Sequence, residues 1–305
     1  MTSLSTSRDA GPAAAGHAGS AAASPLPGVP PWLLLAPILA FLAVLAAATL
    51  TVLRMSVGTP GDEWHTFTLQ NYADLADPYF THSLWLTLRL AFQSMVCAVL
   101  LAIPVALAMA RAESRLARRL MLAGVLLPLL VNLLLQGYGW LVMLGPAGLL
   151  NRALLATGLI ERPLQLLYRE HGVLLGLIQT AFPLAVLPLS SALRAVSRAY
   201  DEAAATLGAT RWQTLRHVTL PLAMPGLVSG ALLVFAYNAS AFAVPLLLGG
   251  RRVPMLAVLV HDQVAPLLNW PAAASGIVLM GATLVAMAVS QRLARVLQRH
   301  DEVAR

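Results

Sequence analysis

Lysine is missing from this chain altogether, and charge of either sign is sparse. The 305 residues contain 20 basic side chains, all of them arginine, and 13 acidic ones. Only 11% of the residues are charged whereas 58% are hydrophobic, and an ordinary soluble domain carries about 25% charged residues. The composition therefore predicts a membrane protein rather than one or two soluble domains.

Several kinds of site are excluded by the residues that the sequence lacks. A nucleotide-binding P-loop uses a lysine to reach the phosphates, so a standard one cannot occur here. The one cysteine, Cys97, allows neither an internal disulfide nor a cysteine metal site. The seven histidines form no H-E-x-x-H pair, and no G-x-S-x-G occurs. We therefore expect no catalytic residue, no metal site and no cofactor on this chain, and any ATP must be used by a partner subunit.

Six apolar stretches of about 20 residues predict six transmembrane helices in an all-α protein. They are Trp32 to Leu53, Leu84 to Ala110, Leu120 to Leu144, Val173 to Leu193, Leu222 to Leu248 and Ala272 to Leu293. The preceding tail, residues 1–31, is expected to be disordered because it can bury little apolar surface. The first helix, residues 32–53, is longer than the core of a signal peptide, so we expect it to be retained.

The arginines indicate the orientation of the chain. The positive-inside rule favours both termini in the cytoplasm, because this orientation places most of the arginines inside, including the basic tail at residues 292–305. The net charge of +7 is accompanied by no basic stripe or aromatic platform, so no nucleic-acid partner is expected.

Ionised side chains are almost absent from the six predicted spans. No Asp or Glu falls inside them, so the carboxylate relay of an ion-coupled transporter is missing. Apart from Arg292 at the very end of the last span, Arg89 is the one ionised side chain within a span, and two interpretations are open for it. It either snorkels outward from the nearby helix end or lines a pathway.

The segment "DEAAATLGATRWQTLRHVTLPLAMPG", residues 201–226, interrupts the apolar pattern. The residues from Ser197 to Thr206 favour a helix, and Gly208 permits a backbone turn that a side chain would resist. Thr210 and Gln213 fit a capping box, which predicts that a second short helix begins there. Pro221 is expected to end this second helix.

Two interpretations of this helix pair are open from the residues alone. Its apolar side chains, such as Trp212, would rest on the lipid surface if it were an interfacial amphipathic segment. Alternatively, the small side chains Ala203, Ala204 and Ala205 leave a low surface that another protein can approach closely.

The same segment resembles the E-A-A-x3-G-x9-I-x-L-P signature of permeases from binding-protein-dependent ABC importers. The matching residues are Glu202, Ala203, Ala204, Gly208, Val218, Leu220 and Pro221, with valine where isoleucine is usual. The resemblance implies a cytoplasmic coupling-helix pair between transmembrane helices 4 and 5 that fits a groove on an ATPase. Glu202 would be a polar contact there, Ala203 and Ala204 the close-packed surface, and Gly208 the turn.

Looser matches extend the resemblance over an expected transmembrane core at residues 81–291 and indicate the spermidine/putrescine-type branch. They are "FTLQNYADL", "GPAGLLNRALLATGLI", "SAFAVPLLLGG" and "LNWPAAAS". The branch implies a bacterial inner-membrane permease that moves a polyamine by alternating access. Its implied partners are cytoplasmic ATPase subunits, a second permease, an external substrate-binding protein and the lipid bilayer. Alternatives are another solute, such as iron(III) or a phosphonate, an ion-coupled secondary transporter, or a non-transporting scaffold.

Polar side chains within the third and fifth spans are candidates for the translocation pathway. They are Asn132, Gln136, Tyr138, Tyr237, Asn238 and Ser240. Each of them could instead make a hydrogen bond between helices. Gln136 also departs from the related permeases, which often carry a basic residue at this position, so no role is carried over to it.

Overall fold

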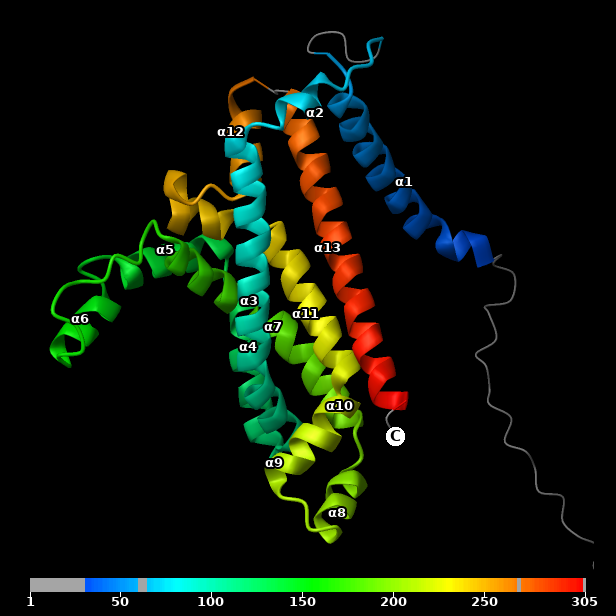
Figure 1. The fold of residues 1–305 in the computed structure, drawn as a ribbon, viewed down its shortest axis with the longest axis vertical. Coiled ribbons are helices and arrows are strands. Elements are labelled where there is room, and N and C mark those ends of the chain that lie inside the picture. Colours follow the sequence, from blue (N-terminus) through cyan, green and yellow to red (C-terminus); the bar gives the residue numbers. More distant parts are fainter. Residues whose placement is uncertain (1–30, 60–64, 268–269, 304–305) are drawn as a thin grey trace, which may run out of the picture. The chain divides into compact units, whose positions relative to one another are not determined.

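The computed structural model describes residues 31–59, 65–267 and 270–303, and the secondary structure in these ranges is helical (Figure 1). Residues 1–30 of the tail expected to be disordered lie outside the described residues. The chain divides into two compact units, residues 1–50 and 51–305. α1 (Pro31–Ser56) contains the whole predicted first span, and most of it belongs to the first unit.

The second unit contains the remaining helices. The longer ones are α3 (Pro78–Arg111), α4 (Arg115–Leu130), α5 (Leu133–Leu144), α7 (Glu170–Ala195), α11 (Met224–Ala239), α12 (Leu256–Leu267) and α13 (Trp270–Val303). The short ones are α2 (Gln70–Asp74), α6 (Leu149–Ala156), α8 (Arg198–Thr206), α9 (Arg211–Thr214) and α10 (Leu220–Leu222), with π-helical turns η1 (Leu215–Thr219) and η2 (Pro245–Gly249) and a 3-10 turn, η3 (Gly250–Arg252).

Five stretches of the described chain are long and apolar enough to cross a membrane. They are Leu35–Ser56, Pro78–Arg111, Leu133–Ala156, Glu170–Ala195 and Ala272–Arg292. A sixth results if Arg211–Leu222 and Met224–Ala239, which are bent by 69° at their junction, form one span. The prediction of an all-α membrane protein is therefore confirmed for the described residues, with five or six candidate spans.

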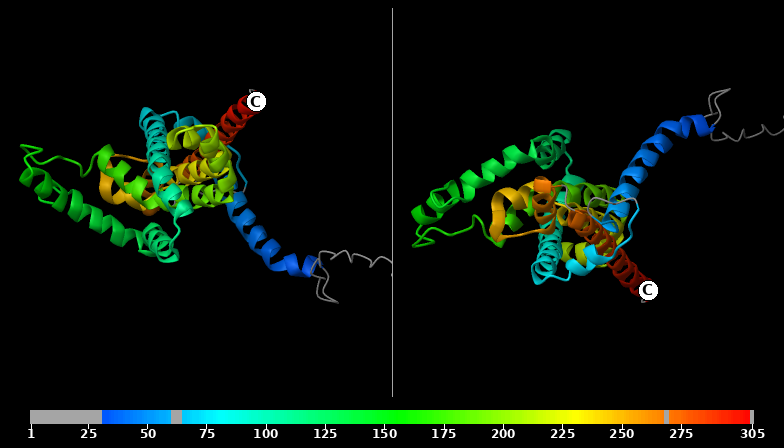
Figure 2. Two further views of the ribbon diagram at one scale, coloured as in Figure 1. Left: turned by 90° about the horizontal axis from the view of Figure 1, so that it is seen from below. Right: turned by 90° about the horizontal axis from the view of Figure 1, so that it is seen from above.

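α3, α7 and α11 lie side by side at the centre of the second unit (Figures 1 and 2). Glycine allows α11 to approach α7 closely. A Cβ atom at Gly226 would lie 2.3 Å from the Cβ of Ala192, and one at Gly230 would lie 3.0 Å from the carbonyl oxygen of Ala185. Two small residues four positions apart are typical of closely packed membrane helices.

The predicted third span, Leu120 to Leu144, is divided between two helices. The helix ends at Leu130 and resumes at Leu133, forming α4 and α5. Pro128 lies in the last turn of α4, where it removes a backbone N–H and weakens the helix. Asn132 then starts α5, because its side-chain oxygen accepts a hydrogen bond from the Leu134 N–H at 2.9 Å.

The fifth predicted span, Leu222 to Leu248, is also shorter than expected. α11 ends at Ala239, and the chain resumes in the π-helical turn η2. The hydroxyl of Ser240 lies 3.1 Å from the carbonyl oxygens of both Ala236 and Tyr237, and such local bonds compete with the helical ladder. Pro245 has no N–H with which to continue that ladder.

Candidate functional site

Short helices connect α7 to α11 at the end of the second unit where α3 also ends (Figure 1). α8 occupies nearly all of the segment for which the sequence predicts a helix. Its N-cap is Ser197, whose hydroxyl accepts from the Ala199 N–H at 3.3 Å. Beyond α8, Gly208 has a φ of +81°, a left-handed conformation that favours glycine.

The second helix begins where the sequence predicts it. Thr210 and Gln213 form a reciprocal capping box: the Gln213 N–H donates to the Thr210 hydroxyl at 3.3 Å, and the Thr210 N–H donates to the Gln213 side-chain oxygen at 2.8 Å. These bonds satisfy two N–H groups that lack partners within the helix.

The prediction that Pro221 ends the second helix is wrong. The helical turns continue through η1 and Pro221 to Leu222, and the bend comes at Ala223. A proline ring crowds the carbonyl four residues earlier and donates no hydrogen bond to it. The wider π-turn η1, directly before Pro221, provides room for the ring, with the Leu220 N–H bonded to the Leu215 carbonyl.

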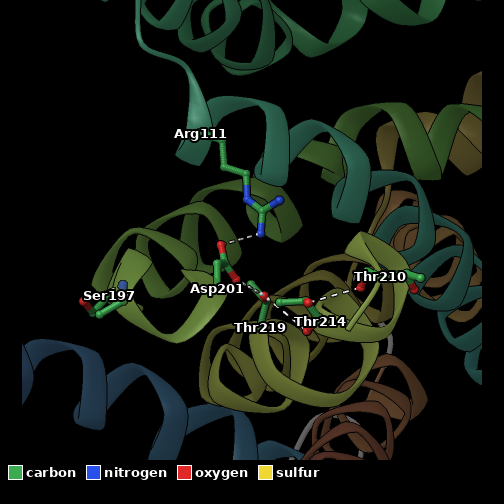
Figure 3. Close-up of polar contacts among 7 residues, drawn as sticks. Arg111, Ser197, Asp201, Thr210, Thr214 and Thr219 are labelled. Carbon is green, nitrogen blue, oxygen red and sulfur yellow. Dashed lines mark hydrogen bonds and ion pairs between the residues drawn. The ribbon is translucent and has the colours of Figure 1, made fainter. Parts of the chain in front are cut away.

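A polar network joins this helix pair to the end of α3 (Figure 3). The guanidinium of Arg111, the last residue of α3, lies 2.9 Å from one carboxylate oxygen of Asp201 in the first turn of α8. The hydroxyl of Thr219, in η1, donates to the other carboxylate oxygen at 3.0 Å. The Thr219 hydroxyl also lies 3.4 Å from the Thr214 carbonyl oxygen, and the hydroxyl of Thr214 donates to the Thr210 carbonyl at 3.1 Å. Hydrogen bonds thus run from α3 through α8 to the start of α9.

The motif analysis does not single out Arg111, Asp201, Thr214 or Thr219. Arg111 and Asp201 are 90 positions apart, and their pairing depends on where α3 and α7 end. The available signal is only that both residues belong to stretches expected at the same face of the membrane.

The outer surface of the helix pair combines a carboxylate, small residues and large apolar side chains. Glu202 and Ala203 are exposed, and Ala204 is half-buried. On either side of the turn between α8 and α9, Leu207 is 88% exposed and Trp212 is 68% exposed. Exposed apolar side chains of this size indicate a contact surface for protein or lipid.

A cleft of about 560 Å³ lies between α8 and the ends of α3 and α7. Its charged lining comprises Arg111, Arg118, Arg194, Arg198, Glu113, Asp201 and Glu202. A second hollow of about 300 Å³ shares Arg111, Asp201 and Glu202 with the first. The Arg111–Asp201 pair therefore lines both hollows.

The side chains of Asn132 and Gln136 bond to the backbone at the break between α4 and α5. Asn132 caps α5, and the Gln136 side chain donates to the carbonyl oxygens of Pro128 and Val131, to the latter at 3.0 Å. Their amides thus bond backbone groups that the break leaves free. Tyr138 on α5 is 59% exposed.

The fifth-span candidates have different environments. Tyr237 is 37% exposed, and the Ser240 hydroxyl bonds to its own helix. Asn238 is fully buried and donates to the Ser94 hydroxyl on α3 at 2.7 Å. Assignment of these residues to a pathway stays a prediction.

Arg89 of α3 forms an ion pair with Glu170, the first residue of α7. The pair lines a cavity of about 420 Å³ together with Phe92 and Cys97. Glu170 lies just outside the predicted fourth span. A search for carboxylates within the spans therefore does not find this partner of Arg89. Within the described ranges, no group of three or more His, Cys, Asp and Glu residues is arranged to hold a metal ion.

The described chain thus has five or six candidate membrane spans, and a polar helix pair connects α7 to α11. Residues 94–300 match the family of binding-protein-dependent transport system inner membrane components. The chain belongs to this family, and it is a multi-pass permease component of the inner membrane rather than an enzyme.

Individual proteins similar to this chain support this membership. The spermidine/putrescine transport system permease protein PotB of Haemophilus influenzae is 33% identical over 242 residues, which are 79% of this chain and 82% of PotB. The molybdenum transport system permease protein ModB of Mycobacterium tuberculosis is 34% identical over 190 residues, 62% of this chain and 68% of ModB.

Solved structures support the fold. A chain in the crystal structure of a bacterial alginate ABC transporter, in complex with a periplasmic protein that holds an alginate pentasaccharide, aligns with a TM-score of 0.73. The alignment covers 88% of this chain and 94% of the solved one at 19% identity, so it bears on the fold alone.

Proposed function

We propose that this chain is a permease subunit of an ATP-driven importer that carries a polyamine, such as spermidine or putrescine, across the inner membrane. The supporting observation is the 33% identity to PotB, a spermidine/putrescine permease, over 82% of that relative. An alignment of this extent includes both the helix pair and the helices that would line a pathway.

The proposed complex contains two cytoplasmic ATPase subunits, a second permease and an external substrate-binding protein. A chain without lysine has no standard P-loop, so ATP is hydrolysed on the partner. Both termini lie in the cytoplasm, which puts Arg111, Arg194 and Arg211 on the inner side as the positive-inside rule requires.

The helix pair from α8 to α10 is the proposed coupling site. Glu202 offers a charged contact at the ATPase, and Ala203 and Ala204 allow a close approach. Gly208 makes the turn between the two short helices, and Leu220 and Pro221 form the end of the second of them, just before α11. The exposure of Glu202 and the positive φ of Gly208 support these roles.

Transport proceeds by alternating access, driven by ATP-dependent closure of the ATPase subunits. Tyr138, Tyr237 and Ser240 are exposed and form the proposed wall of the pathway, where aromatic faces suit an organic cation. Behind that wall, Asn132 and Gln136 bond to the backbone at the break between α4 and α5. Asn238 joins α11 to α3 by its bond to Ser94.

Uptake of radiolabelled spermidine tests this function in cells that lack their own polyamine importers. Uptake is expected only when the permease, its partner permease, the ATPase and the binding protein are all expressed. Glu202→Arg should abolish spermidine-stimulated ATP hydrolysis while leaving membrane insertion intact, and Glu113→Gln is the matched control. Full uptake without the ATPase would contradict the proposal and indicate a secondary transporter.

The identity to ModB favours one alternative solute, an oxyanion such as molybdate. Ligand screening on the associated binding protein distinguishes the two. Spermidine or putrescine binding supports the polyamine assignment, whereas molybdate binding without polyamine binding replaces it and leaves the permease class unchanged.

A further inference from the structure

The carboxylate of Asp201 is bonded from two sides by groups on two other elements. Arg111 of α3 contacts one oxygen at 2.9 Å, and Thr219 of η1 donates to the other at 3.0 Å. The Thr219 residue is 4% exposed, and the Arg111 and Asp201 side chains are 48% and 33% exposed. A carboxylate engaged at both oxygens has one defined orientation.

The two contacts tie together elements that the sequence separates. α3 is one of the three central helices, α8 is the first half of the helix pair, and η1 belongs to its second half. The Thr219 hydroxyl also lies 3.4 Å from the Thr214 carbonyl oxygen, and the Thr214 hydroxyl bonds to the Thr210 carbonyl next to the capping box. The end of α3 is thus connected to both halves of the helix pair.

Thr219 is the last residue of the π-turn η1 and lies two residues before Pro221. A turn closed by an i→i+5 bond contains one residue more than an α-helical turn. Pro221 gives a reason for the wide turn at this place. From this turn the Thr219 hydroxyl bonds to Asp201.

The Arg111–Asp201 ion pair adds little to the free energy of unfolding, so stability is a poor explanation for these contacts. A half-exposed ion pair contributes at most about 1 kcal/mol, because water screens the charges and the side chains lose freedom. Its distinctive property is geometric, since it links a peripheral helix pair to a central helix by groups on three elements.

We propose that Arg111, Asp201 and Thr219 form a strut that makes the helix pair move together with the cytoplasmic end of α3. They are positioning residues, which transmit a displacement without contacting solute or nucleotide. The inference rests on the proposed function, because the displacement is supplied by an ATPase docked on the helix pair.

The first test uses the complete transporter in proteoliposomes and measures spermidine transported per ATP hydrolysed. Asp201→Asn and Arg111→Gln should each lower this ratio at least about fivefold, the low end of typical coupling between sites. The double variant should be no worse than either single variant, because both remove one contact. The charge swap Arg111→Asp with Asp201→Arg should recover at least half of the ratio.

Glu113→Gln is the matched control, because it removes a carboxylate that lines the same cleft and leaves the strut intact. An unchanged ratio in Asp201→Asn, or an equal loss in Glu113→Gln, overturns the strut. Co-purification separates this failure from failure of the proposed function. If the wild-type chain retains no ATPase, both are overturned, whereas retained ATPase with an unchanged ratio overturns the strut alone.

A second test does not depend on the solute. Spin labels at Tyr200→Cys on α8 and Leu101→Cys on α3, in a Cys97→Ser background, report the distance between the two elements. The distance distribution should be narrow and unchanged by ATP, and Asp201→Asn should broaden it. A distance that shifts on ATP binding in the chain with an intact strut overturns the proposal.

Discussion

Asn238 of α11 donates a hydrogen bond to the hydroxyl oxygen of Ser94 on α3 at 2.7 Å, and both residues are fully buried. The Ser94 hydroxyl donates in turn to the Ala91 carbonyl at 2.9 Å, so it is free to accept from the amide. The same Asn238 nitrogen lies 3.4 Å from the Leu177 carbonyl on α7. One amide therefore contacts all three central helices.

Replacing Asn238 should loosen the central helices. Asn238→Ala removes a hydrogen bond between helices, which is worth about 0.6 kcal/mol on average in membrane proteins, and leaves a small cavity that adds to the loss. The thermal midpoint of the purified permease in detergent should fall, whereas Ser229→Ala, at an exposed position of the same helix, should leave it nearly unchanged. Unaltered stability with weakened solute affinity would instead place Asn238 in the pathway wall.

Gly226 should not tolerate even alanine. The added Cβ would lie 2.3 Å from the Cβ of Ala192, so α11 would have to move away from α7. Overpacking of this kind costs about 1–3 kcal/mol. Gly281→Ala is the control, because no atom lies within 4 Å of its added Cβ and alanine favours a helix. Equal midpoints for the two variants in thermal unfolding would contradict the close approach.

Substitutions of Gly208 should be harmful because of its backbone conformation and not because of steric crowding. No atom lies within 4 Å of an added Cβ, but the φ of +81° is unfavourable for any side chain. Gly208→Val should therefore reduce spermidine-stimulated ATP hydrolysis strongly, and Gly208→Asn should reduce it less, since asparagine tolerates this region best. Membrane insertion and the thermal midpoint should change little in both. Equal activity of the valine variant and the wild type would argue against a fixed turn.

The sequence predicts well those features that depend on interactions between residues close together in the chain. The capping box of Thr210 and Gln213 and the turn at Gly208 involve neighbouring residues, so their pattern is visible in the sequence. The Arg111–Asp201 and Arg89–Glu170 pairs join residues 90 and 81 positions apart. Such contacts depend on how long helices pack, and hydropathy does not encode that.

Hydropathy does not locate the breaks in the third and fifth spans, for a related reason. Hydropathy measures whether a stretch suits lipid, and Leu120 to Leu144 does so throughout. Whether the helix continues depends on a few polar groups that can bond to freed backbone atoms. Asn132 provides such a group as the N-cap of α5, and Ser240 provides another where α11 ends.

Gln136 gives a final test of the break between α4 and α5. Its amide nitrogen donates to the carbonyls of Pro128 and Val131, whereas its amide oxygen is buried without a partner among the described residues. Gln136→Leu would leave these two part-buried carbonyls without their side-chain donor, at a cost of about 1 kcal/mol. Gln136→Arg should be as stable as the wild type or more so, because a guanidinium donates to the same carbonyls and has no acceptor to leave unpaired. Thermal unfolding in detergent measures both, with Tyr138→Phe as the control on the same helix, and a leucine variant as stable as the arginine variant would contradict this role.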